Sequence, residues 1–319
     1  MSGEERYINK IPSTKSQISM KSQITKKIFI LITLILLVLQ AGLVYFCLNF
    51  DKIFLSDKKE ELPKHFSYFS KQEFYDEAYS QAANEIIFPD KKVYAGIIPH
   101  HLIVKDKIAA FFLGLENYDY KTVVLIGPNH FEKGNSNVIL SQAKWSTPYG
   151  DIEPDLKLIN KLAQNENYQI DESPFINEHS ISGLVSFIKK SFPKAKIVPI
   201  ILKKETSAEQ SEFLANELLK YSNKEKTLII ASVDFSHELT TKEANEHDEI
   251  SIKAIEDFNF SEIYSLDLDS PATIYTLLKY SELINAKKAQ LLFHTNSGTL
   301  IGKEDEPGTS HNIFYFSEK

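Results

Sequence analysis

Residues 93–130 read VYAGIIPHHLIVKDKIAAFFLGLENYDYKTVVLIGPNH, and this stretch decides the fold class. Two apolar runs rich in β-branched residues, at 93–98 and 122–126, are typical of buried strands. Between them, residues 105–117 have apolar positions at helical spacing, so the stretch predicts a strand, a helix and a second strand parallel to the first. Each predicted strand ends in a polar motif that contains a histidine, His100 after the first and His130 after the second.

The same alternation of short apolar runs and longer amphipathic stretches continues to residue 319. Further strands are predicted at 137–140, 196–202, 227–231, 290–294 and 312–316, and further helices at 153–165, 180–191, 207–222, 240–257 and 271–282. This pattern predicts an α/β fold over residues 91–319, a three-layer sandwich around a mostly parallel central sheet. Residues 51–90 are expected to be a charged linker followed by a lead-in helix over 67–87.

An uninterrupted run of 23 uncharged residues, 28–50, precedes the domain. At a rise of 1.5 Å per residue, a helix of this length crosses a hydrocarbon core of roughly 30 Å. The run predicts a transmembrane helix rather than a buried core helix or a cleaved signal peptide, because VYFC at 44–47 offers neither a cleavage site nor a lipoprotein box. Lys26 and Lys27 before it and Asp51 after it favour a single-pass cell-membrane protein with a cytoplasmic basic tail, 1–27, and an extracytoplasmic domain.

The composition excludes several classes of function. The net charge of the 319 residues is −7, and the basic tail carries +4, so the residues after the apolar run carry −11. Arg6 is the only arginine, so the folded part lacks guanidinium groups for phosphate, and nucleic-acid binding is not expected. The single cysteine, Cys47, excludes disulfides within the domain and multi-cysteine zinc sites. Any metal site must therefore use histidine and carboxylate.

Histidine motifs follow three of the predicted strands. Besides His100 and His130, the run at 227–231 leads into SVDFSH, which ends at His237. Ligands of open α/β sheets bind beyond the carboxyl ends of the strands, so these motifs predict a site. The 30-residue spacing of His100 and His130 predicts that they end neighbouring strands. A single histidine in such a loop is more often a hydrogen-bonding residue, but three at equivalent strand ends favour a shared site.

Five motifs occur in a fixed order: PHH at 99–101, GPNH at 127–130, STPYGD at 146–151, NEHSI at 177–181 and SVDFSH at 232–237. Together they resemble the Memo family, the AmmeMemoRadiSam system protein B of prokaryotes, and the resemblance covers roughly residues 93–317. It implies a fold similar to that of the class III extradiol ring-cleaving dioxygenases, which bind non-haem iron(II) through two histidines and a carboxylate.

The resemblance implies a set of metal ligands. His100 and His130 match the family's metal-binding histidines, and Asp269, with Ser270 beside it, stands where many members have a cysteine. A carboxylate in place of a thiolate makes a harder site, so one divalent metal is expected, Fe(II) first, with Mn, Zn or Cu as alternatives. A competing interpretation makes Asp269 only the N-cap of a helix that begins near Pro271.

The resemblance also implies the other residues of the pocket. His237 matches the acid/base histidine of the ring-cleaving relatives, and Asp234 is expected to orient it or to lie in the outer shell of the metal. His101 and Leu102 replace the alanine and glycine of the family motif, which alters the mouth of the pocket. The further residues expected to line it are Glu178, His179 and Ser270, with His294 and His311 at its rim. By contrast, His65 and His247 are expected on the solvated surface.

Three classes of function fit these features. The leading hypothesis is a membrane-anchored, dioxygenase-like metalloenzyme that acts on a small molecule. The alternatives are a non-enzymatic protein that holds or senses a metal and a zinc-dependent hydrolase. An aspartate at the third ligand position favours iron or manganese over copper, and the presence of His237 and Asp234 favours catalysis over storage.

Overall fold

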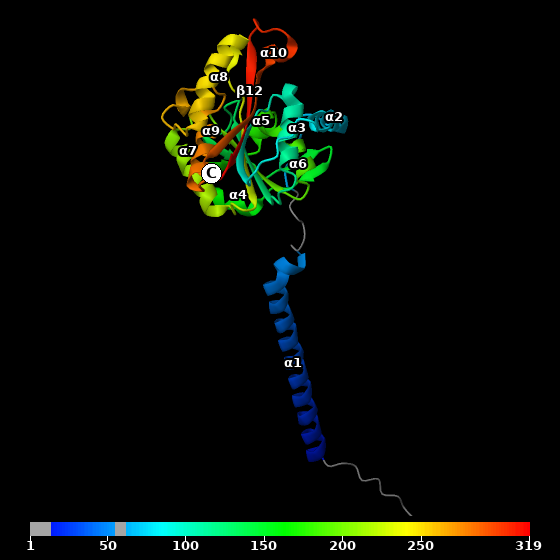
Figure 1. Ribbon diagram of the computed structural model, residues 1–319. Helices are drawn as coiled ribbons and strands as arrows, with labels where there is room; N and C mark the ends of the chain where they lie inside the picture. The colour runs from blue at the N-terminus through cyan, green and yellow to red at the C-terminus, as the bar shows by residue number, and fades with distance from the viewer. Residues whose placement is uncertain (1–13, 55–61) are drawn as a thin grey trace, which may run out of the picture. The chain divides into compact units, whose positions relative to one another are not determined.

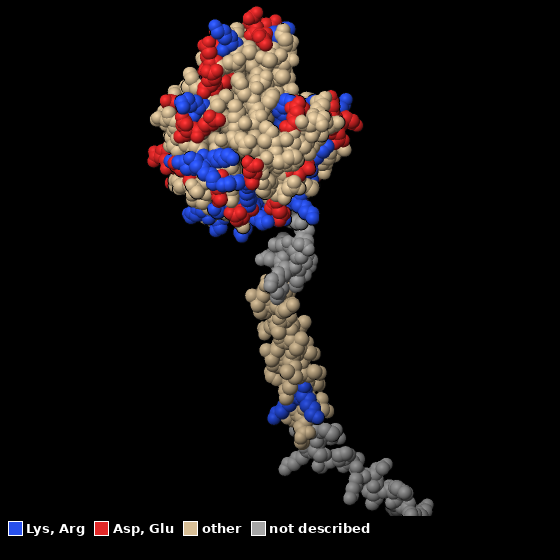
Figure 2. All heavy atoms as spheres, in the orientation of Figure 1, with Lys and Arg blue, Asp and Glu red and all other residues tan. Residues whose placement is uncertain are grey.

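The computed structural model describes residues 14–54 and 62–319, and the chain divides into two compact units, 1–61 and 62–319. The first unit contains helix α1 (Thr14–Phe54). Within it, Lys21–Leu48 is long and apolar enough to cross a membrane, by length and composition, and a signal sequence would pass the same test. Figure 2 shows lysines near the amino-terminal end of α1 and no charged side chain on the rest of its described surface.

A nine-stranded sheet forms the centre of the second unit (Figure 1). Its four middle strands are parallel and lie in the order β2 (Val93–Ile98), β9 (Thr227–Ser232), β3 (Thr122–Pro128) and β8 (Lys196–Leu202). Antiparallel neighbours flank them on both sides: β12 (Gly308–Ser317) beside β2 and β4 (Val138–Leu140) beside β8. The outer strands are β10 (His237–Leu239) and β11 (Lys288–Asn296), both paired with β12, and β7 (Tyr168–Ile170), paired with β4.

The predicted fold class is confirmed, but one feature of its strand order differs from the expectation. Strand β9 lies between β2 and β3, so His100 and His130 do not end neighbouring strands. The strand–helix–strand spacing fixes that the two strands are parallel, but it leaves open whether the crossover skips a strand. Because β9 occupies the gap, its own polar end, Ser232 to Asp234, lies between the two histidines.

Helices cover both faces of the sheet (Figure 1). On one face lie α2 (Gln72–Ala82), α3 (Lys105–Gly114), α5 (His179–Ser182) and α6 (Val185–Ser191), and on the other α4 (Leu156–Leu162), α7 (Ala208–Tyr221), α8 (Thr241–Glu256) and α9 (Pro271–Leu283). The middle strands serve both cores by alternation: in β3, Val123 and Leu125 join one buried cluster, and Val124 and Ile126 join the other. The short helix α10 (Ser297–Ile301) precedes β12.

A small second sheet includes the last residues of the predicted linker. It has the order β1 (Lys64–Phe66), β5 (Lys144–Thr147) and β6 (Gly150–Ile152), and β1 is parallel to β5. This pairing buries His65, whose ring lies 4.9 Å from that of Trp145 and whose Nε2 lies 2.8 Å from Oε2 of Glu172. The expectation that His65 is a solvated surface residue was therefore wrong, because a three-residue strand has no sequence period that would reveal its burial.

The predicted helix at 180–191 is two short helices, α5 and α6, which are joined at Gly183 and Leu184. A side chain on Gly127 at the end of β3 would meet Ser180 at 2.7 Å, so glycine there allows α5 to pack directly against the sheet. This close approach brings Glu178 and His179 beside the loop that follows β3.

Candidate metal centre

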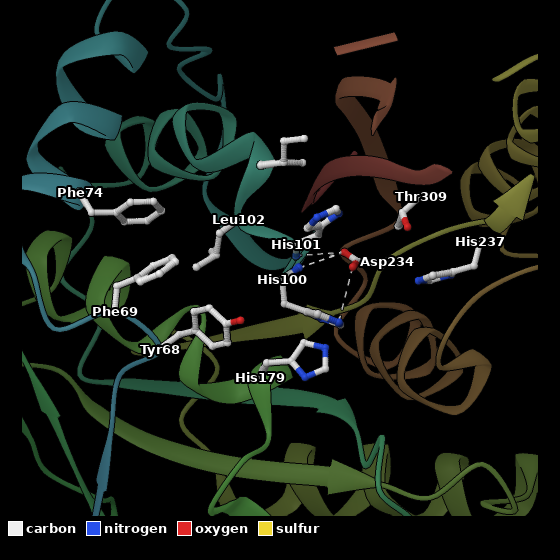
Figure 3. A pocket seen from close by; sticks show the side chains of 11 residues that line it. Tyr68, Phe69, Phe74, His100, His101, Leu102, His179, Asp234, His237 and Thr309 are labelled. Carbon is white, nitrogen blue, oxygen red and sulfur yellow. Dashed lines mark hydrogen bonds and ion pairs between the residues drawn. The ribbon is translucent and has the colours of Figure 1, made fainter. Parts of the chain in front are cut away.

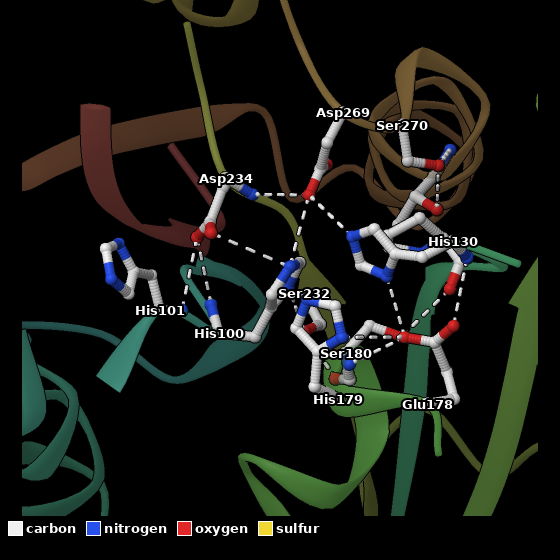
Figure 4. A network of polar contacts seen from close by, with 12 residues as sticks. His100, His101, His130, Glu178, His179, Ser180, Ser232, Asp234, Asp269 and Ser270 are labelled. Carbon is white, nitrogen blue, oxygen red and sulfur yellow. Dashed lines mark hydrogen bonds and ion pairs between the residues drawn. The ribbon is translucent and has the colours of Figure 1, made fainter. Parts of the chain in front are cut away.

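Four segments meet at the carboxyl edge of the parallel strands (Figure 4). His100 follows β2, His130 follows β3, and Asp234 follows β9. The fourth segment is the loop before α9, which carries Asp269 and hydrogen-bonds the β9 loop through Asp269 N and Asp234 O at 3.2 Å. Parallel strands place their carboxyl ends at one edge, so residues far apart in the sequence become neighbours here.

His100 is buried, and its hydrogen bonds fix which ring nitrogen carries the proton. Its Nδ1 lies 3.1 Å from Oγ of Ser232, and that hydroxyl donates its own hydrogen to the carbonyl of Ser180 at 2.6 Å. Ser232 can therefore only accept from His100, so Nδ1 carries a hydrogen. In the neutral ring, Nε2 then keeps its lone pair, which is the form that binds a metal.

His130 is oriented in the same way by a carboxylate. Glu178 is fully buried, and its Oε1 lies 2.7 Å from Nδ1 of His130. Oε2 of Glu178 accepts the backbone N–H of His130 at 2.9 Å. Glu178 also caps α5 by accepting the N–H of Ser180. Burial disfavours the ionised form of Glu178, but these bonds outweigh it and lower the pKa of the carboxyl. The Nε2 lone pair of His130 is thus also available to a metal.

Asp269 faces both free imidazole nitrogens. Its Oδ2 lies 3.2 Å from Nε2 of His100 and 3.8 Å from Nε2 of His130, and it accepts the backbone N–H of Asp234 at 3.1 Å. Its Oδ1 is buried and has no hydrogen-bond partner among the described residues. Two imidazoles and a carboxylate that converge in this way fit a divalent metal of the first transition row.

The loop before α9 also decides between the two interpretations of Asp269. The N-cap of α9 is Ser270, whose side chain accepts the N–H of Thr273, with Pro271 as the first helical residue. Because Ser270 caps the helix, the carboxylate of Asp269 is left to face the histidines. Ser270 itself is buried against Thr273 and is not among the residues that line the adjoining pocket.

The charges of the cluster suit a cation. Burial lowers the pKa of His130, but Asp269 and Glu178 outweigh it and raise that pKa to about 9. Burial likewise opposes protonation of His100, while Asp234 and Asp269 raise its pKa. For Asp269, burial favours the neutral form, but the two histidines lower the pKa of the carboxyl to about 2. Positive charge is thus stabilised between these groups, where a metal ion would replace protons.

His179 joins the cluster more closely than the sequence predicts. Its ring stacks on that of His130 at 4.0 Å and lies 5.1 Å from that of His100. One ligand atom from each of these three histidines lies within 4.8 Å of the other two, and the same holds for His100, Asp234 and Asp269. Burial and then the two other imidazoles lower the pKa of His179 to about 4, which keeps it neutral and able to bind a metal.

A pocket of about 530 Å³ adjoins the cluster (Figure 3). His237 lines it from β10 and is exposed. Of the two roles expected for Asp234, the first is not seen, because no hydrogen bond between described residues joins it to His237. Its Oδ1 instead accepts the backbone N–H groups of His100 at 3.1 Å and His101 at 3.4 Å. This carboxylate instead fixes the end of β2, and its Oδ2 lies 3.6 Å from Nε2 of His100.

The remaining predicted histidines lie in different surroundings. His101 lines the pocket, and its Nδ1 lies 3.0 Å from Nε2 of His311, which is fully buried behind it rather than at the rim. His294 is 2.9 Å from the buried Asp248 and is not among the lining residues. His247 is exposed, as expected.

Comparison with known proteins places these motifs in a family. The model of the family described as "Memo-like protein" matches residues 55–308. A MEMO1 family protein of Methanosarcina mazei is 32% identical over 228 residues, which cover 68% of this chain and 83% of that protein. A MEMO1 family protein of Methanocaldococcus jannaschii is 33% identical over 195 residues, which cover 57% and 67%. A MEMO1 family protein of Nitrosopumilus maritimus is 27% identical over 220 residues, which cover 66% and 80%.

Proposed function

The chain belongs to the family of Memo-like proteins, and from this premise we propose that it is a mononuclear metalloenzyme of the dioxygenase-like, non-haem type. His100, His130 and Asp269 would hold the metal. The observation that carries this proposal is that Nε2 of His100 and Nε2 of His130 both face one carboxylate oxygen, Oδ2 of Asp269, at 3.2 and 3.8 Å. Outer partners on both Nδ1 atoms support it, because such bonds accompany metal-ligating histidines.

The donor set favours Fe(II), with Mn(II) next, because it contains two imidazoles, a hard carboxylate and no thiolate. The bound ion would supply a Lewis-acidic and redox-active centre beside the pocket. The protein's own groups then have separate tasks. Ser232 and Glu178 orient the imidazoles, burial of His100 and Asp269 keeps water from their ligand atoms, and the imidazole of His237 can give or take a proton across the pocket.

One observation favours a second candidate function, a zinc-dependent hydrolase. If His179 rather than Asp269 completes the ligand set, the site has three histidines, which is a known ligand set of catalytic zinc. A non-enzymatic protein that holds or senses a metal would keep the cluster but would not need His237.

Metal analysis of purified variants tests the proposal. We expect one metal ion per chain in the wild type and in His237→Ala, and loss of the metal in His130→Ala, because of these two histidines His130 belongs to the cluster of possible ligands and His237 does not. His247→Ala is the matched surface control. His179→Ala should keep the metal if Asp269 is the third ligand. Equal metal loss in His237→Ala and His130→Ala would make His237 a ligand and remove its proposed acid/base role.

Activity screening separates the enzyme from a storage or sensing protein. The metal-loaded wild type and His237→Ala should be compared on panels of small molecules with and without dioxygen. Turnover that needs dioxygen and is lost in His237→Ala is the expected result. Turnover of ester or amide substrates without dioxygen would favour the zinc-dependent hydrolase.

We further propose that α1 anchors the protein in the cell membrane as a single span, with the amino terminus cytoplasmic and the folded unit outside. The apolar segment within α1 and the lysines on its amino-terminal side support this orientation. A reporter fused after Lys319 should then be active only outside the cytoplasm, and high salt should not release the protein from membranes. A cytoplasmic reporter signal would reverse the orientation, and release by salt would exclude the anchor.

A further inference from the structure

The pocket beside the metal cluster has one apolar side, which comes from the segment that follows the linker. Tyr68, Phe69 and Phe74 line the pocket on one side of His100, and His237 and Thr309 lie on the opposite side (Figure 3). Tyr68 is 58% exposed and Phe69 is 38% exposed. Large aromatic surfaces that stay open to solvent next to a buried polar cluster are suited to contact a ligand.

This aromatic wall is held in place by the fold. The backbone N–H of Ser67 donates to Ser146 O at 2.9 Å, and that of Tyr68 donates to Ser182 O at 3.0 Å. The carbonyl of Phe69 accepts the hydroxyl of Tyr75 at 3.3 Å, and the rings of Phe69 and Phe74 lie 4.4 Å apart. The rings are thus positioned before any ligand arrives, which reduces the ordering cost of binding.

The charge of the pocket narrows what it can accept. Among the described residues that line the pocket there is no lysine or arginine, and the one carboxylate among them is that of Asp234. The nearby ammonium group of Lys105 lies over the ring of Phe74 at 4.6 Å but pairs with Glu77 at 2.8 Å. A ligand whose flat part carries an anionic group would find no lysine or arginine to pair with among the described residues that line the pocket.

We propose that the site selects molecules with a metal-binding oxygen head group joined to a flat, uncharged, apolar body, and that Tyr68 and Phe69 determine this specificity. The proposal rests on the proposed metal site, because the head group is placed by the metal and the body by the aromatic wall. The space beside His100 and the space beside the aromatic rings belong to one cavity, because His100, Tyr68 and Phe69 all line it.

Hydroxamates of different size test the proposal directly. The full-length protein in detergent is loaded with Co(II), whose visible absorption changes when a ligand coordinates, so the signal reports binding at the metal alone. The probes are acetohydroxamate, 2-naphthohydroxamate and a naphthohydroxamate that carries a sulfonate on its far ring. Detergent takes up the naphthyl probe equally in every sample. The quantity compared between variants is therefore the ratio of the affinity for 2-naphthohydroxamate to the affinity for acetohydroxamate.

In the wild type, 2-naphthohydroxamate should bind at least tenfold more tightly than acetohydroxamate, a difference of about 1.4 kcal/mol, and the sulfonate should remove the gain. The double variant Tyr68→Ala/Phe69→Ala should lose the preference, whereas Tyr68→Phe should keep it. Phe213→Ala, which removes an exposed ring from α7, is the matched control and should behave as the wild type.

The outcomes separate this inference from the metal site on which it rests. If acetohydroxamate coordinates in every variant but the naphthyl preference is absent, or is unchanged in the double variant, the aromatic wall does not select ligands and the inference is wrong. If Co(II) does not bind to the folded wild type, the proposed metal centre fails, and this inference fails with it.

Discussion

Asp269→Ala should lower the affinity of the protein for divalent metal more than about 100-fold, because loss of a mere outer partner of a metal ligand already costs 10- to 100-fold. The substitution removes the carboxylate that faces Nε2 of both His100 and His130 and leaves only imidazoles in the proposed ligand set. Competition with a chromogenic chelator, with Fe(II) under anaerobic conditions and with Co(II), measures the loss.

Ser270→Ala is the matched control for this experiment. It removes the N-cap of α9 in the same loop, so the free energy of unfolding should fall by about 1 kcal/mol while the metal is retained. Metal loss in Ser270→Ala equal to that in Asp269→Ala would mean that the loop, rather than the carboxylate, matters.

Asp269→Cys distinguishes a ligand from a bystander. If residue 269 binds the metal, a thiolate there should shift the preference from Fe(II) toward Zn(II) or Cu(I) without unfolding the domain. Iron, zinc and copper titrations of the wild type and the variant measure this shift. An unchanged order of affinities in a folded variant would assign the third position to another residue, with His179 the first to test.

The sequence predicts most of the fold because buried strands and amphipathic helices have different periods. The run at 196–202 coincides with β8, and the runs at 93–98 and 122–126 mark β2 and β3. The order of strands is harder to predict, since the insertion of β9 between β2 and β3 depends on how crossovers pack. The short strands β1, β5, β6, β7 and β10 were missed, because strands of three or four residues seldom show a period; β4, of similar length, was predicted from its apolar run.

The candidate site, like the fold, has a part that the sequence predicts and a part that it does not. The positions of His100 and His130 at strand ends follow from local pattern, and Asp269 follows from the family resemblance. The partners that fix their geometry could not be predicted. Ser232 orients His100 only because β9 is inserted beside β2, and Ser270 rather than Asp269 caps α9 because of the local backbone. Such contacts depend on tertiary packing, which leaves no periodic signal in the sequence.

Glu178→Gln should affect both the metal and the fold, because Glu178 makes three connections from a fully buried position. Its carboxylate accepts Nδ1–H and the backbone N–H of His130, and it caps α5 through Ser180. Glutamine keeps the size, but its amide is uncharged and replaces one acceptor by a donor, so one N–H partner must lose its bond. The free energy of unfolding should fall by roughly 1.5–3 kcal/mol, which is typical of a lost hydrogen bond to a charged group.

The same substitution should weaken metal binding by 10- to 100-fold, the usual cost of losing an outer partner of a ligating histidine. Removal of the negative charge should also lower the pKa of His130 from its raised value of about 9, which NMR titration of the metal-free protein would detect. Glu172→Gln is a matched control, because Glu172 pairs with His65 in the small sheet in a similar way. That variant should lose stability but keep its metal. If both variants keep the metal equally well, Glu178 supports the fold alone, and His130 needs no carboxylate behind it to bind a metal.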